Sequence, residues 1–153
     1  AVRKAHPSRM DAFASAGAAP LARWVDGALE LRVPPTSWPV AHTSTRSLLD
    51  VDPLHWPRVE IVTSHAGSDG RVVDALLAQG GLRGLIVAAT GSGTLHRELE
   101  AALERAIRQG IGVRRVTRCA DGVIDDRQTR WCASTMPTPA KARVELMLDL
   151  APA

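Results

Sequence analysis

The stretch from Gly84 to Thr117 contains the pattern that most constrains the fold. Its first part, Gly84-Leu-Ile-Val-Ala-Ala-Thr90, is apolar without alternation, which is typical of a strand covered on both faces of a sheet. The glycine-rich segment Gly91-Ser-Gly-Thr94 follows, and Gly112-Val-Arg-Arg-Val-Thr117 predicts a second strand. Between them, apolar residues recur with helical spacing at Leu95, Leu99, Ala102, Leu103, Ala106 and Ile107. This order predicts parallel strands with helices packed against them.

The same alternation of strands and helices extends over residues 58–153. Arg58-Val-Glu-Ile-Val62 predicts a strand, and the next helix opens at Ser68-Asp-Gly70 and stops at Gly80-Gly81. A last strand is expected near Trp131 to Ser134. A last helix follows Thr138-Pro139, where a hydroxyl cap precedes proline at the first helical position. We therefore expect residues 58–153 to form a small three-layer α/β domain, with a parallel β-sheet flanked by helices.

The first 57 residues follow a different pattern. Asp26-Gly27 stands between two alternating runs, which predicts a β-hairpin within residues 1–35. Residues 36–57 are rich in proline, serine, threonine and aspartate, which is typical of an extended linker. The chain begins at Ala1 without methionine or a capping signal, so we expect residues 1–35 to be the remnant of a longer domain.

Charge and hydropathy argue against two classes of partner. The formal charge is +3, but 19 Lys and Arg are spread among 16 Asp and Glu, and the aromatic residues are only four Trp and one Phe. A nucleic-acid surface needs clustered cations with interleaved aromatics, so we expect no nucleic-acid partner. No apolar run approaches the ~20 residues that span a bilayer, so we expect a soluble protein without a membrane partner.

Cysteine and histidine are placed without metal-ligand spacing. The two cysteines, Cys119 and Cys132, have no Cys or His at the separations that zinc sites use. The histidines stand singly, at His6, His42, His55, His65 and His96. We therefore expect no metal and no cofactor, two buried thiols, and histidines that are structural or exposed to solvent.

The glycine-rich turn is the candidate binding site on pattern alone. A turn that joins a parallel strand to a helix offers free backbone N–H groups, and Ser92 and Thr94 add two hydroxyls. The third glycine of a dinucleotide fingerprint is missing, and no Gly-Lys-Ser/Thr follows as in a P-loop. Two interpretations stay open: a phosphate or nucleotide site, and the favoured one, a tight turn with a hydroxyl helix cap.

Several segments resemble, in order and spacing, the C-terminal domain of bacterial L-asparaginases, of the asparaginase/glutaminase family. They are Val59-Glu-Ile-Val62, Gly84 to Thr94, Gly110-Ile-Gly-Val-Arg-Arg-Val-Thr-Arg118, Gly122-Val-Ile124 and Pro139-Ala-Lys-Ala-Arg143. Two further segments, Val2 to Ser15 and Pro20-Leu-Ala-Arg-Trp-Val-Asp-Gly27, resemble the end of that family's N-terminal domain and the hairpin after it. The resemblance implies that the chain is the C-terminal half of such a protein, with residues 1–35 as the remnant of the N-terminal domain.

The resemblance implies an amidohydrolase that converts L-asparagine and water to L-aspartate and ammonia, with L-glutamine as a slower substrate. The family's nucleophile is a threonine in a Thr-Gly-Gly-Thr turn, assisted by a Thr-Asp-Thr motif and a lysine. Neither threonine motif occurs in this sequence, so we expect the chain to be inactive alone. The catalytic lysine has a counterpart in Lys4. Buried beside a threonine hydroxyl it would accept the proton, whereas near a free chain end we expect it to be solvated.

The turn acquires a role from the same resemblance. In asparaginases the matching loop reaches into the active site of a neighbouring subunit and holds the substrate's α-amino and carboxylate groups, so Ser92 and Thr94 are the substrate-binding candidates. Asparagine often stands at the position of Thr94, and a hydroxyl makes fewer hydrogen bonds than an amide. The resemblance also implies a homo-oligomer. Related enzymes occur both in the cytoplasm and beyond the inner membrane, and of the two we expect the cytoplasm rather than the periplasm.

Three alternatives remain. One is a non-catalytic assembly module that self-associates or complements a separate N-terminal chain. The second is a nucleotide-binding α/β domain that uses the turn from Gly91 to Thr94. The third, a variant of the main hypothesis, is a transamidation subunit built on the same hydrolase domain.

Overall fold

The computed structural model describes residues 2–15, 19–32, 51–119, 124, 133 and 138–151. The chain divides into two compact units, Ala1–Ser44 and Thr45–Ala153, and each is described by itself. The division falls inside the segment 36–57, where the sequence predicts a linker. Of that segment, the described part includes one turn of 3-10 helix, Pro53–His55, which Asp52 caps at its start.

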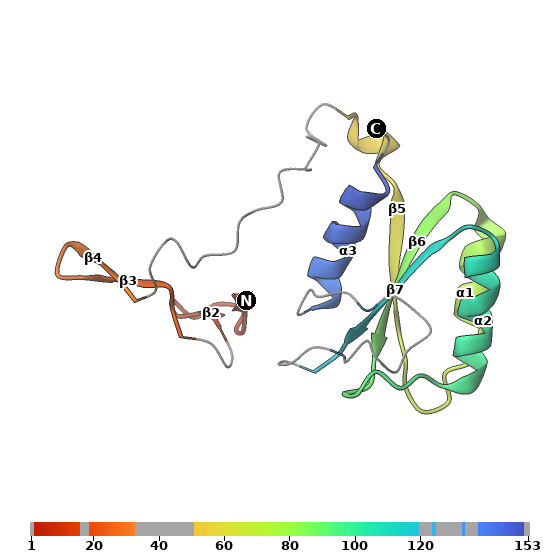
Figure 1. The fold of residues 1–153 in the computed structure, drawn as a ribbon, viewed down its shortest axis with the longest axis horizontal. Coiled ribbons are helices and arrows are strands. Elements are labelled where there is room, and N and C mark those ends of the chain that lie inside the picture. The colour runs from red at the N-terminus through yellow and green to blue at the C-terminus, as the bar shows by residue number, and fades with distance from the viewer. Residues whose placement is uncertain are drawn as a thin grey trace. The chain divides into compact units, whose positions relative to one another are not determined.

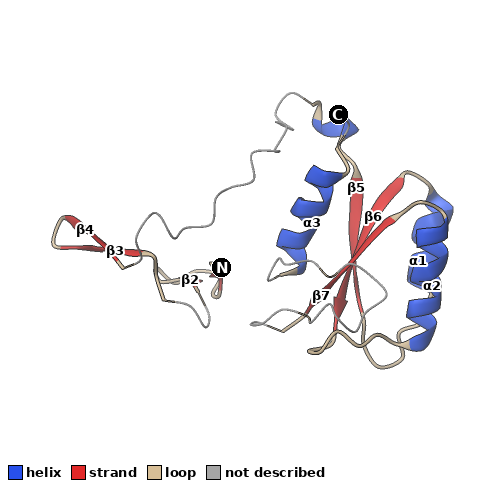
Figure 2. Cartoon of the chain, in the orientation of Figure 1, coloured by secondary structure: helices blue, strands red, loops and turns tan. Residues whose placement is uncertain are grey.

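The second unit is an α/β domain, as predicted (Figure 1). Its elements are β5 (Arg58–Thr63), α1 (Arg71–Gln79), β6 (Leu82–Ala89), α2 (Arg97–Arg108), β7 (Gly112–Thr117) and α3 (Pro139–Asp149). The three strands pair in parallel in the order β5-β6-β7. Helices α1 and α2 cover one face of the sheet and α3 covers the other, which gives three layers (Figure 2).

Two apolar cores fill the spaces between the layers, and β6 contributes to both. Leu85 and Val87 pack with α1 and α2, beside residues such as Leu103. Ile86 points to the other face, where it packs with Val59 and with residues of α3. Because the strand is buried on both faces, its sequence is apolar throughout instead of alternating.

Charged side chains fasten α3 to the sheet. Arg114 of β7 forms ion pairs with Glu145, at 2.8 Å, and with Asp149. Arg143 Nε donates a hydrogen bond of 2.7 Å to the carbonyl oxygen of Val59. The helix begins as the sequence predicts, with Thr138 Oγ1 accepting from the N–H of Lys141 and proline at the first turn.

Several features of this unit differ from, or lie outside, what the sequence predicts. Helix α2 is capped by His96, whose Nδ1 accepts from the N–H of Glu98, and not by a hydroxyl. Ile107 is exposed, because the buried stripe of α2 is Leu99, Ala102, Leu103 and Ala106. The strand expected near 131–134 lies outside the described residues, except for Ala133, which bridges Arg115 in parallel.

The first unit contains two short antiparallel strand pairs. The hairpin predicted around Asp26-Gly27 is present, with β3 (Ala22–Val25) paired to β4 (Ala28–Leu31). A second pair, β1 (Arg3–Lys4) with β2 (Phe13–Ala14), has no signal in the sequence, since two-residue strands are too short for a periodic pattern.

Close packing of α1 against α2 makes Gly70 a sensitive position. A Cβ on Gly70 would lie 2.6 Å from the Cβ of Ala102, and neither methyl group can rotate away. We expect Gly70→Ala to destabilise the domain by about 1–3 kcal/mol through overpacking, measured by urea unfolding. The matched control is Gly112→Ala, because a Cβ there meets only ordinary contacts, of 3.5 Å with Leu146 and 3.6 Å with Leu150. Recovery in Gly70→Ala/Ala102→Gly would assign the loss to this contact, and an unaltered Gly70→Ala would contradict it.

Candidate functional site

The three parallel strands bring several polar groups to the carboxyl edge of the sheet. Ser64 follows β5, the turn 90–94 follows β6, and Arg118 and Cys119 follow β7. Arg118 Nη1 donates to the carbonyl oxygen of Ser64 at 3.2 Å, and its N–H donates to Ala89 O at 2.9 Å. The ends of all three strands are thereby tied together at the edge where parallel sheets bind ligands.

The turn after β6 is closed by its own hydrogen bonds. The N–H of Gly93 donates to Thr90 O at 2.8 Å, and the N–H of Thr90 donates to Thr94 O at 3.3 Å. The hydroxyl oxygen of Thr90 lies 3.1 Å from Thr94 O and 2.7 Å from Thr94 Oγ1. These four contacts hold residues 90–94 as one rigid loop.

The loop is also held from outside, at Gly93. Arg115 Nη1, from β7, donates to Gly93 O at 2.7 Å. Gly93 has a φ of 90°, and a Cβ on it would lie 2.8 Å from the side chain of Ile124. Both the left-handed backbone and the close approach therefore require glycine at this position.

The directions of two hydrogen bonds determine whether the Thr94 hydroxyl donates to a ligand or accepts from it. A carbonyl oxygen only accepts, so the 3.1 Å contact between Thr90 Oγ1 and Thr94 O uses the single hydroxyl proton of Thr90. The 2.7 Å contact between the two hydroxyl oxygens must then use the proton of Thr94. With both contacts satisfied, Thr94 Oγ1 presents lone pairs and acts as an acceptor, which suits an ammonium group better than a carboxylate.

A buried serine connects this loop to the neighbouring elements. Ser64 is buried, and its Oγ accepts from the N–H of His96 at 3.3 Å. Its own N–H donates to Ala88 O at 2.9 Å. Ser64 therefore fixes the start of α2 against the ends of β5 and β6.

The residues predicted from the sequence occupy two different units. Ser92 and Thr94 share the turn and are exposed at the edge of the sheet. Lys4 lies in β1 of the first unit, where it is exposed and stands opposite Phe13 in the strand register. The roles assigned to the three residues remain predictions.

Cys119 differs from expectation. It is a free, exposed cysteine, and its Sγ lies 3.3 Å from where a Cβ on Gly91 would be. Its N–H donates to Thr117 Oγ1 at 3.0 Å. The prediction of a buried thiol is wrong here because the residue falls beyond the end of β7; Cys132 lies outside the described residues.

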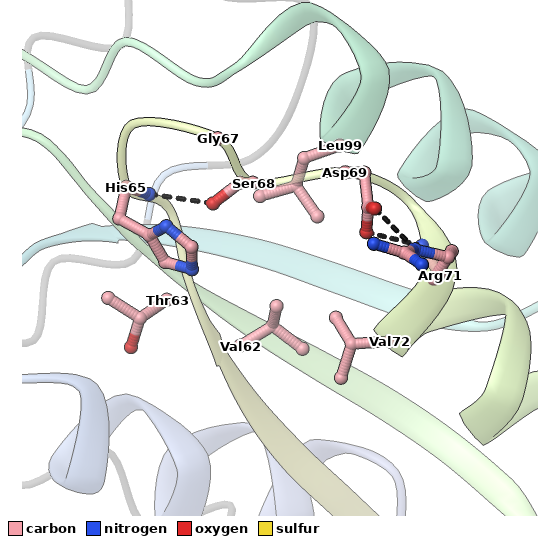
Figure 3. A pocket seen from close by; sticks show the side chains of 9 residues that line it. All are labelled: Val62, Thr63, His65, Gly67, Ser68, Asp69, Arg71, Val72 and Leu99. Carbon is pink, nitrogen blue, oxygen red and sulfur yellow. Dashed lines mark hydrogen bonds and ion pairs between the residues drawn. The ribbon is translucent and has the colours of Figure 1, made fainter.

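A hollow of about 250 Å³ lies beside the end of β5 (Figure 3). Its lining combines apolar residues, among them Val62 and Leu99, with the polar residues His65, Ser68, Asp69 and Arg71. Ser68 Oγ accepts from the N–H of His65 at 2.8 Å. Asp69 is ion-paired with Arg71, and hydrogen bonds from Arg71 lower the pKa of that carboxyl group below its ordinary value of 3.8. The His65 ring is not bound to these groups; its Nδ1 lies 2.9 Å from Ala66 O.

Within the described parts of the chain, no three His, Cys, Asp or Glu side chains come together in a way that would hold a metal ion. Nor does any helix among the described residues have the length and hydropathy needed to cross a membrane.

Sequence reasoning did not identify Thr90, Arg115 or Arg118. A usable signal existed, since Arg114, Arg115 and Arg118 are charged residues in and after a strand of a mostly buried sheet. Arginine side chains that are partly buried in this way need hydrogen-bond or ion-pair partners, because an unpaired buried charge is costly. One partner of Arg115 is the carbonyl of Gly93, 22 residues away in sequence, which only the fold reveals.

Comparison with known proteins gives a consistent result. Residues 58–152 match the family model described as the glutaminase/asparaginase C-terminal domain. L-asparaginase 2 of Bacillus subtilis is 32% identical over 108 residues, which are 68% of this chain and 28% of that protein. A glutamyl-tRNA(Gln) amidotransferase subunit of Pyrococcus abyssi is 29% identical over 126 residues, which are 81% of this chain and 27% of that protein.

A solved structure agrees with these matches. The crystal structure of a probable cytoplasmic L-asparaginase from Campylobacter jejuni superposes with a TM-score of 0.80 at 27% identity. The match covers 97% of this chain and 46% of that chain, so the present chain spans less than half the length of these relatives. Because the domain match alone covers residues 58–152, this chain belongs to the glutaminase/asparaginase family and carries that family's C-terminal domain.

Proposed function

We propose that this chain is the C-terminal portion of an L-asparaginase-type amidohydrolase, which converts L-asparagine and water to L-aspartate and ammonia. The observation that carries the proposal is the rigid turn 90–94, which lies inside the matched domain and presents the Thr94 hydroxyl at the carboxyl edge of the sheet. Relatives named L-asparaginase support the reaction class. L-glutamine is the second substrate of the proposal.

In the proposed mechanism the chain binds and orients the substrate and handles a proton. Thr94 Oγ1, as an acceptor, takes a hydrogen bond from the α-ammonium group of the amino acid. Ser92 supplies a second hydroxyl at the same edge. Lys4 takes up the proton of a threonine hydroxyl as the threonine oxygen attacks the amide carbon. The proton then passes to the amide nitrogen, which leaves as ammonia, and water hydrolyses the acyl-enzyme that remains. The sequence contains neither Thr-Gly-Gly-Thr nor Thr-Asp-Thr, so the attacking threonine comes from outside these residues.

The proposed assembly follows from the need for an attacking threonine outside these residues. We propose a homo-oligomeric enzyme in the cytoplasm, in which the turn serves an active site completed by other polypeptide. The alternative is a non-catalytic module that only self-associates or complements a separate N-terminal chain. The relatives named as amidotransferase subunits favour a third version, in which the released ammonia serves a transamidation.

The first prediction concerns turnover. We expect the purified chain alone to release no ammonia from L-asparagine, and we expect release when it is mixed with the separately expressed N-terminal part of a related asparaginase. Lys4→Met should abolish the activity of the mixture. Arg23→Met, which removes another exposed cation from the first unit, should leave it intact. Release of ammonia at an enzymatic rate by the chain alone would contradict the proposal that the attacking threonine lies outside it. If the mixture also releases no ammonia, the non-catalytic module is favoured.

The second prediction concerns selectivity in the active mixture. Thr94→Val should lower kcat/KM for L-asparagine by about 10- to 100-fold, since a hydrogen bond to a charged group is lost. Thr90→Val removes the group to which the Thr94 hydroxyl donates, so that Thr94 can act as a donor as well as an acceptor. We therefore expect a smaller ratio of kcat/KM for L-asparagine to kcat/KM for succinamate, the analogue without the α-amino group. Thr90→Ser keeps the hydroxyl and should retain that preference, as should the control Thr63→Val on an exposed strand residue. If Thr90→Val lowers kcat/KM equally for L-asparagine and succinamate, the role of Thr90 is only structural.

A further inference from the structure

Arg114 and Arg115 are neighbours in β7 and point to opposite faces of the sheet. Arg114 lies on the α3 side, where it forms ion pairs with two acidic residues of that helix. Arg115 lies on the same side as Val113, which packs against the core of α1 and α2. Its Nη1 donates to Gly93 O at 2.7 Å. The first arginine therefore fastens a helix, whereas the second contacts the turn of the candidate site.

The hydrogen bond from Arg115 to Gly93 is shielded from water. Nε and Nη2 of Arg115 are buried, and so is Gly93. Ile124, itself only 6% exposed, lies against that glycine. A hydrogen bond from a charged donor is stronger in such surroundings, and it polarises the group that accepts it. The guanidinium charge therefore acts directly on the peptide group that joins Gly93 to Thr94.

The same peptide group has a donor to offer. Within the described parts of the chain, the N–H of Thr94 has no acceptor, and Thr94 is exposed. A hydrogen bond at the carbonyl oxygen of a peptide group draws electron density from its nitrogen, so its N–H becomes a stronger donor. The Thr94 carbonyl oxygen and hydroxyl proton are engaged with Thr90. Thr94 thus offers one donor, its N–H, and one acceptor, Oγ1.

We propose that Arg115 is a positioning residue that makes the Thr94 N–H the donor for the α-carboxylate of the substrate. This inference rests on the proposed function, because it concerns the recognition of the same L-asparagine. The substrate carries an ammonium group and a carboxylate on one carbon atom, and Thr94 offers an acceptor and a donor on one residue. Arg115 acts through the peptide group and does not touch the substrate. Recognition of the carboxylate therefore depends on Arg115, and recognition of the ammonium group on the Thr94 hydroxyl.

Other donors near the turn fit this role less well. The N–H of Gly93 already donates to Thr90 O, which leaves the Gly91 N–H on a peptide group polarised only by a neutral donor. Arg118 is an exposed cation at the end of β7, but its Nη1 donates to the carbonyl oxygen of Ser64. Direct binding of the carboxylate by Arg118 is therefore the competing hypothesis.

The test uses the active mixture of this chain with the N-terminal part of a related asparaginase, and two substrates that each lack one α-group. Succinamate lacks the amino group, and 3-aminopropanamide lacks the carboxylate. We expect Arg115→Met to lower the ratio of kcat/KM for L-asparagine to kcat/KM for 3-aminopropanamide by about 10-fold, and to retain the ratio for succinamate. Thr94→Val keeps the N–H and loses the hydroxyl, so it should show the reverse. Arg115→Lys keeps a cationic donor and should recover part of the loss.

The matched control is Arg114→Met, which removes the neighbouring arginine from the other face of β7 and should leave both ratios unchanged. Arg118→Met tests the competing cation. An equal fall of both ratios in Arg115→Met would overturn the inference, since it would show that the turn is merely distorted. A fall of the 3-aminopropanamide ratio in Arg118→Met but not in Arg115→Met would also overturn it.

A second measurement does not depend on turnover. The amide resonance of Thr94 is followed by NMR in the same mixture while L-aspartate or β-alanine, which is aspartate without the α-carboxylate, is added. We expect a saturable shift with L-aspartate that Arg115→Met weakens, and no shift with β-alanine. This result without ammonia release would leave the inference standing and refute the proposed activity. Ammonia release with equal shifts for both compounds, or with none, would leave the activity standing and refute the inference.

Discussion

Burial of β6 on both faces is the constraint on which the α/β domain depends. A strand with Leu85 and Val87 on one side and Ile86 on the other needs a helical layer on each side, and α1 with α2 and α3 supply them. Parallel pairing with β5 and β7 then brings three strand ends to one edge. The polar groups of the candidate site, Ser64, Thr90 and Arg118, lie together there because of this packing.

The turn that follows β6 is held by bonds within itself and by Arg115. The Thr90 and Thr94 hydroxyls bond to each other, and the carbonyl groups of Thr90, Gly93 and Thr94 accept hydrogen bonds. A site that is already ordered loses less conformational entropy when it binds. The same internal bonding uses the hydroxyl protons of Thr90 and Thr94. Under the proposed function, Thr94 then orients the substrate and the attacking threonine comes from other polypeptide.

The sequence predicts the parts of this structure that depend on local chemistry. The buried run of β6, the Thr138-Pro139 start of α3 and the Asp26-Gly27 hairpin each follow from a few neighbouring residues. Sequence patterns do not predict the features that depend on tertiary contacts. His96 replaces a hydroxyl as the cap of α2, and the β1–β2 pair has no periodic signal. Ser92 and Thr94 were identifiable as a turn, whereas the role of Thr90 depends on a hydroxyl separation of 2.7 Å that no spacing rule gives.

The bond from Arg115 to Gly93 O has a consequence for the order of folding. The guanidinium group reaches that carbonyl only after β7 has paired alongside β6, which requires closure of the long crossover through α2. Local hairpins and helices form early, while parallel pairing over such a crossover is slow because the chain entropy is lost before the contacts are gained. The turn 90–94 therefore acquires its final shape late in folding, after the parallel sheet is complete.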